Sequence, residues 1–210
     1  EEHQVSLNTA KEVSKALKKL NINHKFLTVN PITFNKDISR FSRNYICFNA
    51  LHGPFGEDGK IQKILKIKKF RITHSNQYSS YNCFNKIKSK KIINKFRIPT
   101  PLYRVIKCKD INSSYLAKVR KKFLKFVLKP VFSGSSHGLK VIKSTKDLNI
   151  FCNELKNFKK KFAEEEQFII EKYISGKELT VSILNKGAVL QPLEVTEIIS
   201  LNQSYDYKAK

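Results

Sequence analysis

Apolar positions in the first 75 residues switch between helical and extended spacing. They recur at helical spacing from Val13 to Leu20, behind the sequence TAKE at 9–12, which has the form of a helix-capping box. Short apolar runs predict strands at 26–29, 45–51 and 70–73, and helical spacing predicts a second helix at 61–68. This alternation is typical of an α/β fold, in which ligands favour the carboxyl ends of strands.

The pattern changes from about Asn76 onward, where longer amphipathic segments follow one another. A helix at 87–96 must end at IPTP (98–101), because proline cannot continue it. Strands are predicted at 103–106, 126–130, 139–142 and 168–174, with helices starting near Ser113 and spanning 148–158. The last predicted unit is a hairpin, with strands at 178–184 and 189–198 joined by NKG at 185–187.

Composition then limits the class of protein. With 210 residues and 40% hydrophobic content, the chain is long enough for a buried core and is not disordered on composition. No apolar run reaches the roughly 18–20 residues that a membrane span needs. The four cysteines lie far apart and form no C-x-x-C, so neither a disulfide framework nor a zinc site is indicated. We therefore expect a soluble, cytoplasmic protein with free thiols and no membrane partner.

The charge suggests nucleic acid as a partner, because 41 basic residues face only 17 acidic ones, for a net charge of +24. Only six of the basic residues are arginines, however, and the lysines are spread along the whole chain. A solvated lysine surface is therefore favoured, with no specific nucleic-acid partner. A basic nucleic-acid-binding protein remains the alternative, and it predicts tight binding with a steep salt dependence.

Glycine is scarce, and its distribution is more informative than the charge. Five of the seven glycines fall in two segments, HGPFGEDG at 52–59 and SGSSHG at 133–138. Such clusters mark places where the backbone turns sharply or approaches a ligand closely, although two ordinary turns are the alternative. The first segment directly follows a predicted strand, so it lies where α/β proteins bind ligands.

The second glycine segment follows Lys129, which ends a predicted strand. Small residues in such a loop can present N–H groups and hydroxyls to phosphate oxygens, with the lysine adding charge. The segment is neither a Walker A loop nor a G-x-G-x-x-G turn, so a phosphate-gripping hairpin and a plain serine-rich hairpin both remain open. In the predicted strand at 168–174 and just after it, the carboxylates of Glu171 and Glu178 could bind a nucleotide. The alternative is an ordinary surface strand.

Four motifs together resemble those of D-alanine–D-alanine ligases. They are ALHGPFGEDGKIQ at 50–62, Lys129-Pro130 with GSSHG at 134–138, EKYISGKELTV at 171–181, and YDYKAK at 205–210. They stand in the family's order, and the similarity runs from residue 2 to residue 210. The resemblance implies an α/β fold with a Rossmann-like, pre-ATP-grasp N-terminal domain (1–75), a central ATP-grasp domain (76–174) and the start of a truncated C-terminal ATP-grasp domain (175–210).

The resemblance also implies a reaction. In this family ATP phosphorylates the carboxylate of one D-alanine, and the amine of a second D-alanine displaces phosphate to give a peptidoglycan precursor. ATP with Mg²⁺ or Mn²⁺ is the implied cofactor set, D-alanine the substrate, and a homodimer one possible assembly of the parent enzyme. Another ATP-grasp carboxylate–amine ligase is the alternative, and the second substrate is open between D-alanine, D-lactate and D-serine.

Roles follow from the resemblance, residue by residue. Catalytic roles are implied for Glu2, Ser135 and Lys210. The substrate pocket would contain Glu2, Val5, Ser6, His52, Glu57 and Tyr205. ATP would be bound by Lys86, Lys129, Ser135, Ser136, Glu171, Lys172, Ile174, Glu178 and Lys210. The chain departs from the family's pattern at His3, Gln4, His74 and Asn85.

The ends of the chain carry a further expectation. It opens without methionine and stops at Lys210, before the family's expected arginine and its metal-binding Asp, Glu and Asn. The sequence is therefore expected to be a piece of a longer protein, with the metal ligands beyond Lys210. Because Mg²⁺ neutralises phosphate charge in phosphoryl transfer, the piece alone is expected not to turn over.

Overall fold

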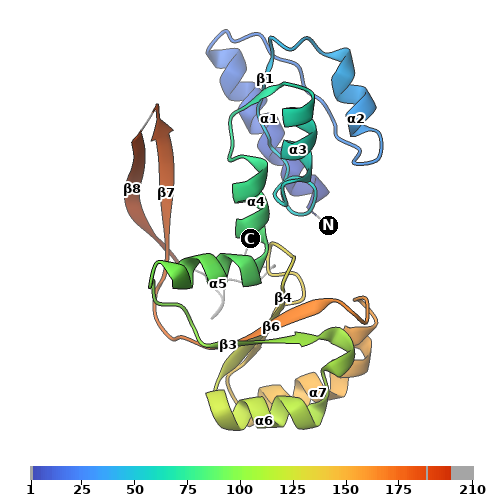
Figure 1. Ribbon diagram of the computed structural model, residues 1–210, viewed down its shortest axis with the longest axis vertical. Coiled ribbons are helices and arrows are strands. Elements are labelled where there is room, and N and C mark those ends of the chain that lie inside the picture. The colour runs from blue at the N-terminus through green and yellow to red at the C-terminus, as the bar shows by residue number, and fades with distance from the viewer. Residues whose placement is uncertain (1, 188, 200–210) are drawn as a thin grey trace.

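The computed structural model describes residues 2–187 and 189–199, whose elements form a thin N-terminal group, a central sheet and a projecting hairpin (Figure 1). The N-terminal group is built on a pair of very short parallel strands, in which Ile46 aligns with Arg71 and Cys47 with Ile72. Its elements are α1 (His3–Lys19), α2 (Phe34–Asp37), the 3₁₀ helix η1 (Ile38–Arg40), β1 (Ile46–Cys47), α3 (Lys60–Ile67) and β2 (Arg71–Ile72).

Two predictions for this group are wrong. The capping box at 9–12 is not a helix start, because α1 already begins at His3 and Thr9 lies inside it. The run at 26–29 is not a strand, because no described strand lies beside it to share its backbone hydrogen bonds, although Leu27 and Val29 pack against the local core. The strands predicted at 45–51 and 70–73 are each reduced to two residues.

The central group is an antiparallel sheet with the strand order β3-β6-β4-β5. Its elements are β3 (Tyr103–Lys107), the 3₁₀ helix η2 (Cys108–Asp110), α6 (Ser113–Phe123), β4 (Phe126–Pro130), β5 (Lys140–Ile142), α7 (Thr145–Lys159) and β6 (Gln167–Lys172). These strands and helices confirm the predictions for this region, except that β6 ends two residues before the predicted Ile174. Both helices cover one face of the sheet (Figure 1).

Strand alternation explains why the two faces of this sheet differ. In β4, Phe126, Leu128 and Pro130 are buried, and the first two join Phe168 and Ile170 of β6 in the core under α6 and α7. Successive side chains of a strand point to opposite faces, so Lys129 and Glu171 belong to the other face. The sheet therefore presents one apolar face and one face that carries charged groups.

Two helices connect the N-terminal group to the charged face. The first, α4 (Gln77–Phe84), was not predicted; the second, α5 (Lys86–Lys95), matches the helix expected at 87–96 within one residue. Asn76 and Asn85 cap them by accepting hydrogen bonds from backbone N–H groups of the first turn. The Lys86 N–H also donates to the Val131 carbonyl at 3.1 Å, which ties the start of α5 to the end of β4.

The hairpin of β7 (Glu178–Lys186) and β8 (Val189–Ile198) confirms the last prediction. It projects away from the sheet (Figure 1), and every residue of β7 is exposed. Within the described residues, no helix combines the length and the apolar character that crossing a membrane requires. The α/β class is confirmed, whereas the Rossmann-like nature of the N-terminal group and the domain limits stay predictions.

Candidate functional site

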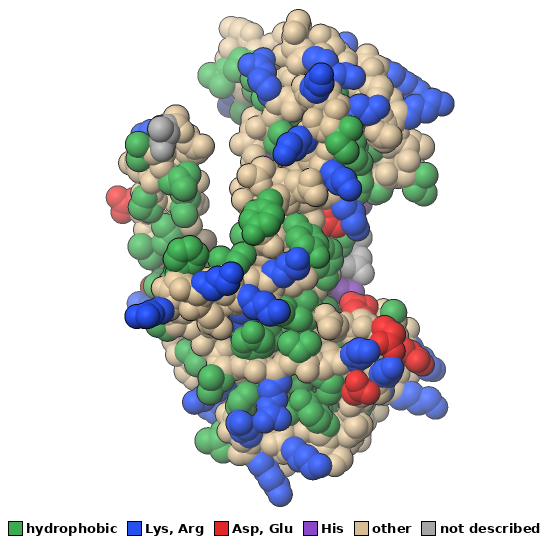
Figure 2. Space-filling view, viewed as in Figure 1, with side chains coloured by type: hydrophobic (Ala, Val, Ile, Leu, Met, Phe, Trp, Pro, Cys, Tyr) green, Lys and Arg blue, Asp and Glu red, His purple; other side chains and the backbone are tan. Residues whose placement is uncertain are grey.

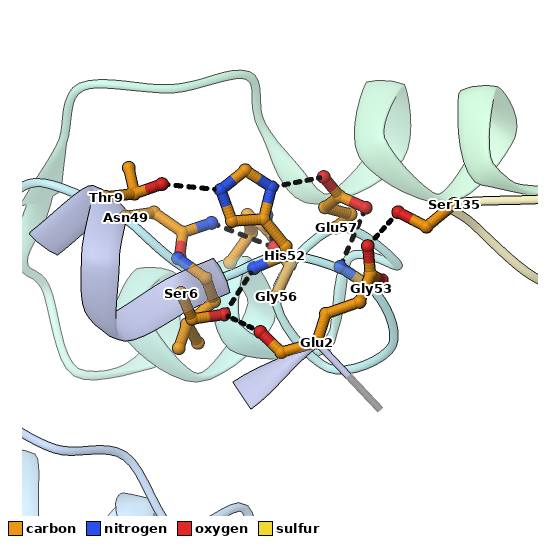
Figure 3. A network of polar contacts seen from close by, with 11 residues as sticks. Glu2, Ser6, Thr9, Asn49, His52, Gly53, Gly56, Glu57 and Ser135 are labelled. Carbon is orange, nitrogen blue, oxygen red and sulfur yellow. Dashed lines mark hydrogen bonds and ion pairs between the residues drawn. The ribbon is translucent and has the colours of Figure 1, made fainter. Parts of the chain in front are cut away.

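The carboxylate of Glu2 lies where the N-terminal group meets the second glycine segment (Figure 3). Its Oε1 accepts a short hydrogen bond from the hydroxyl of Ser135. The first turn of α1 is held to the first glycine segment by Ser6, whose hydroxyl donates to the Glu2 carbonyl at 2.9 Å and accepts from the His52 N–H at 3.0 Å. Glu2 thus contacts both glycine segments, which are about eighty residues apart in the chain.

The first glycine segment arranges the side chains around this carboxylate. Glu57 folds back over the loop and accepts a hydrogen bond from the Gly53 N–H at 2.9 Å, while its other oxygen lies 3.8 Å from Nδ1 of His52. On the other side of the ring, Nε2 of His52 is hydrogen-bonded to the Thr9 hydroxyl at 2.9 Å. Gly53 has a φ of +75°, and a Cβ there would collide with the Glu2 carboxylate, so glycine is needed at this position.

The second glycine segment is a tight loop between β4 and β5. Ser135 and Ser136 have positive φ values of 44° and 59°, a conformation that non-glycine residues adopt rarely. Such strain collects at functional sites when the surrounding contacts hold it. Gly138 has a φ of +68°, and a Cβ there would approach the Pro130 ring to 2.8 Å, so the loop closes directly onto the end of β4.

Lys86, at the start of α5, reaches this same loop. Its ammonium donates to the Ser133 carbonyl at 2.5 Å, two residues before Ser135. Burial and, to a smaller extent, the nearby charge of Lys129 lower the pKa of Lys86, the Glu171 carboxylate opposes both, and the resulting pKa is about 8. A partly buried ammonium with a lowered pKa is a group whose environment favours an added negative charge, such as a phosphate.

Lys129 and Glu171 form an ion pair on the charged face of the sheet. Glu171 is 7% exposed, and its second oxygen is held by Lys90 of α5 at 2.8 Å. Burial works to raise the pKa of Glu171, but the charges and hydrogen bonds of Lys129 and Lys90 prevail and hold it below its usual range. The Glu171 side chain therefore has lysine partners, and its implied contact with adenine stays a prediction.

The other predicted site residues in the described part of the chain lie in the loop at 133–138 or at exposed positions. Ser136 lies in the loop itself, next to Ser135. Val5, Lys172, Ile174 and Glu178 are exposed, and the last three lie on the segment that leads from β6 into the hairpin. Tyr205 and Lys210 lie outside the described residues.

Sequence reasoning missed Lys90 and Thr9. Lys90 stands four residues after Lys86, so both side chains lie on one face of α5, and this spacing is the signal that could have identified it. Thr9 was assigned to a capping box, and only the fold brings it to His52, 43 residues away.

The family's metal ion has no place among the residues described. Within residues 2–187 and 189–199, no group of three His, Cys, Asp or Glu side chains is arranged to hold a cation. We assign no step to Mg²⁺ or Mn²⁺ on these residues.

Basic side chains are scattered over the face shown in Figure 2 and do not form a single stripe. An acidic group interrupts them beside the end of β3, where Glu165 pairs with Lys107 and Lys109. This distribution matches the solvated lysine surface that the composition favours, while the absence of a nucleic-acid partner stays a prediction.

Comparison with known proteins gives one consistent family. A family model described as the C-terminus of D-ala D-ala ligase matches residues 92–210. The D-alanine–D-alanine ligase of Pelagibacter ubique is 38% identical over 212 residues, covering 100% of this chain and 64% of that protein. The Wolbachia pipientis enzyme from Culex pipiens is 36% identical, covering 100% of this chain and 61% of its own length. The chain thus spans less than two thirds of these relatives.

Solved structures agree with the sequence comparisons. The D-alanine–D-alanine ligase of Bacillus anthracis superposes with a TM-score of 0.71 at 27% identity, covering 99% of this chain and 63% of that one. The same enzyme complexed with ATP gives a TM-score of 0.71 over 93% of this chain and 62% of its own. These neighbours have the ATP-grasp fold, as predicted.

Proposed function

The chain belongs to the D-alanine–D-alanine ligase family, and on that premise we propose that its protein joins two D-alanines with ATP as phosphoryl donor. The carboxylate of the first D-alanine attacks the γ-phosphorus, forming D-alanyl phosphate and releasing ADP. The amine of the second D-alanine then attacks the acyl carbon, and inorganic phosphate leaves. The dipeptide would serve peptidoglycan synthesis in the cytoplasm.

One observation carries this proposal: a single loop contacts both halves of the chemistry. The Ser135 hydroxyl donates to Glu2, and the Ser133 carbonyl accepts from Lys86. The Glu2 carboxylate can hold the ammonium of D-alanine, and the Lys86 ammonium can hold a phosphate. These two groups contact the loop at positions only two residues apart. Phosphoryl transfer depends on positioning and charge more than on covalent chemistry from the protein, and this arrangement supplies both.

We propose the following division of roles. Glu2, supported by Ser135, holds the ammonium of the first D-alanine, while His52 and Glu57 shape the pocket beside it. Lys86 and Lys129 balance the phosphate charges. The remaining proposed ATP contacts are Ser136 in the loop and, for adenine and ribose, Glu171, Lys172, Ile174 and Glu178.

The finer architecture belongs to the same proposal. A Rossmann-like layer up to about residue 75, a central ATP-grasp domain to 174 and the start of a further domain would place the pocket between the first two. The contact of Glu2 with Ser135 crosses that junction, and the contact of Lys86 with Ser133 lies beside it within the central domain, which supports this division.

The test is formation of D-alanyl-D-alanine by the complete protein that contains this chain. Mass spectrometry should detect the dipeptide only with ATP and D-alanine, together with one phosphate per dipeptide. Glu2→Gln should lower kcat/KM for D-alanine by about a hundredfold, since it removes a charge-assisted contact in a partly buried site. Glu12→Gln, on an exposed part of the same helix, is the matched control and should leave activity unchanged. ATP-dependent ligation of a different acid, with none of D-alanine, would overturn the proposal.

A further inference from the structure

Lys90 is the most deeply buried lysine among the described residues, at 5% exposed, and the proposed reaction gives it no role. It lies on α5, which covers the charged face of the central sheet, and its ammonium sits 4.9 Å from the centre of the Tyr103 ring. Tyr103 of β3 is the register partner of Glu171 on β6. The helix therefore places Lys90 directly over the end of the strand that carries Glu171.

The three protons of the Lys90 ammonium are all used. They reach the Thr100 hydroxyl at 2.6 Å, the Pro101 carbonyl at 3.0 Å and Oε1 of Glu171 at 2.8 Å. Buried charges persist only when paired and hydrogen-bonded in this way. Lys90 is thus held in one place by the turn at 100–101 and by one carboxylate.

Glu171 divides its two oxygens between two lysines. Oε1 faces Lys90 and Oε2 faces Lys129. The two lysines differ in access: the Lys90 side chain is 7% exposed, whereas that of Lys129 is 27% exposed. Lys129 is also close enough to Lys86 to lower its pKa, so it borders the loop that we propose for phosphate. Lys129 is therefore the more accessible partner of Glu171, and Lys90 is the more deeply buried one.

The sharing of Glu171 by two lysines lowers the free-energy cost of moving Lys129 toward a phosphate. Moving Lys129 away from Glu171 would leave a buried carboxylate unpaired, which is strongly unfavourable when no other partner exists. Lys90 remains on the other oxygen, so Glu171 stays balanced and Lys129 is released at small cost. Without Lys90, Glu171 would hold Lys129 away from the nucleotide.

We propose that Lys90 is a positioning residue that keeps Glu171 neutralised and so frees Lys129 to bind a nucleotide phosphate. This inference rests on the proposed function, because it takes ATP as the ligand of the loop at 133–138. It concerns the phosphates alone and predicts no role in adenine recognition.

The test compares ATP with adenosine on the complete protein that contains this chain. Lys90→Met should weaken ATP binding about tenfold or more by calorimetry, since each factor of ten corresponds to about 1.4 kcal/mol and a buried pair is being broken. Adenosine binding, followed by nuclear magnetic resonance, should stay within about twofold, because adenosine has no phosphate for Lys129. Lys90→Arg should retain ATP binding, and Lys91→Met, an exposed lysine on the same helix, is the matched control.

Each result decides one point. Equal losses for ATP and adenosine would show a merely structural role, and an unchanged ATP affinity would also overturn the inference. If Lys90→Met does not fold, the comparison moves to the Glu171→Gln background, where no buried carboxylate holds Lys129 and Lys90→Met should have no further effect on ATP binding. A further loss there would contradict the inference. If the complete wild-type protein binds no ATP at all, the proposed function is contradicted instead.

Discussion

The central sheet and the N-terminal group make their cores in different ways. The central group packs fifteen buried residues, among them Phe126, Leu128 and Phe168 at 0% exposed, between four strands and two helices. The N-terminal group has five buried residues in its cluster and a sheet of only two residues per strand. The candidate site lies between a group with a large core and a group with a small one, so we expect the N-terminal group to open more easily than the central group.

The largest effect is expected from a substitution in the core of the central group, which tests whether this core is the more stable of the two. Phe168→Ala removes a fully buried ring from β6 and should lower the free energy of unfolding by about 3–5 kcal/mol. Urea denaturation and hydrogen exchange of β4 and β6 would measure the loss. A smaller loss than that of an equivalent change at Phe34, in the N-terminal cluster, would reverse our ranking of the two regions.

Removing the charge of Lys86 should change ATP binding more than it changes the free energy of unfolding. Lys86→Met should weaken ATP binding by about 1.4–3 kcal/mol, or ten- to a hundredfold, because a hydrogen-bonded phosphate loses a charged partner. Burial disfavours the Lys86 charge, so the melting temperature should stay the same or rise. Lys88→Met, an exposed position on the same helix, is the control, and a comparable loss of ATP affinity there would contradict the assignment.

The N-terminal group can be destabilised without the central group, through the contact between Gly53 and Glu2. In Gly53→Ala, the new methyl group would collide with the Glu2 carboxylate in a left-handed backbone, at a cost of about 1–2 kcal/mol. Hydrogen exchange should accelerate in residues 2–73 and remain unchanged in β4 and β6. D-alanine affinity should fall while ATP affinity stays. Faster exchange throughout the chain would mean that the two regions open as one unit.

The pH dependence of ATP binding tests the role of Lys86, which contacts the loop of the central group. The pKa of Lys86 is lowered to about 8, so Lys86 is charged at pH 7 and loses its charge as the pH rises through 8. ATP affinity should therefore fall several-fold, about 1 kcal/mol, between pH 7 and 9. The same group binds fewer protons folded than unfolded above pH 8, so its effect on stability has the opposite sign and stability rises. Lys86→Arg should remove this pH dependence of binding, and its persistence would exclude Lys86 as the cause.

The smallest effect is expected in the hairpin, which has no core in the described residues. Leu190 is 68% exposed, so Leu190→Ser should change the free energy of unfolding by less than about 0.5 kcal/mol. Thermal denaturation of this variant serves as the reference for Phe168→Ala. A loss above about 1 kcal/mol would show that the hairpin packs against another surface.

Local signals predicted the central group well because its apolar runs and apolar helix stripes are clear. Phe126, Leu128 and Phe168 lie in short apolar runs that mark strands, and α7 is preceded by a true capping box at Ser144. The same signal failed at Thr9, which has the right residue types but sits one helical turn or more inside α1. Helix α4 was missed because it buries only Asn82 and Phe84 and so shows no apolar stripe.

The sequence by itself determined the glycine segments, the four motifs and hence the family, because these depend on residue types at short spacing. The resemblance also assigned Ser135, Lys86 and Lys129 to ATP binding, and this assignment stays a prediction. Only the tertiary structure decided that Glu2 reaches Ser135, 133 residues away, and that Glu171 is shared by Lys129 and Lys90. Such contacts depend on strand register and on which helix covers which face of the sheet, and both are set by packing over the whole chain.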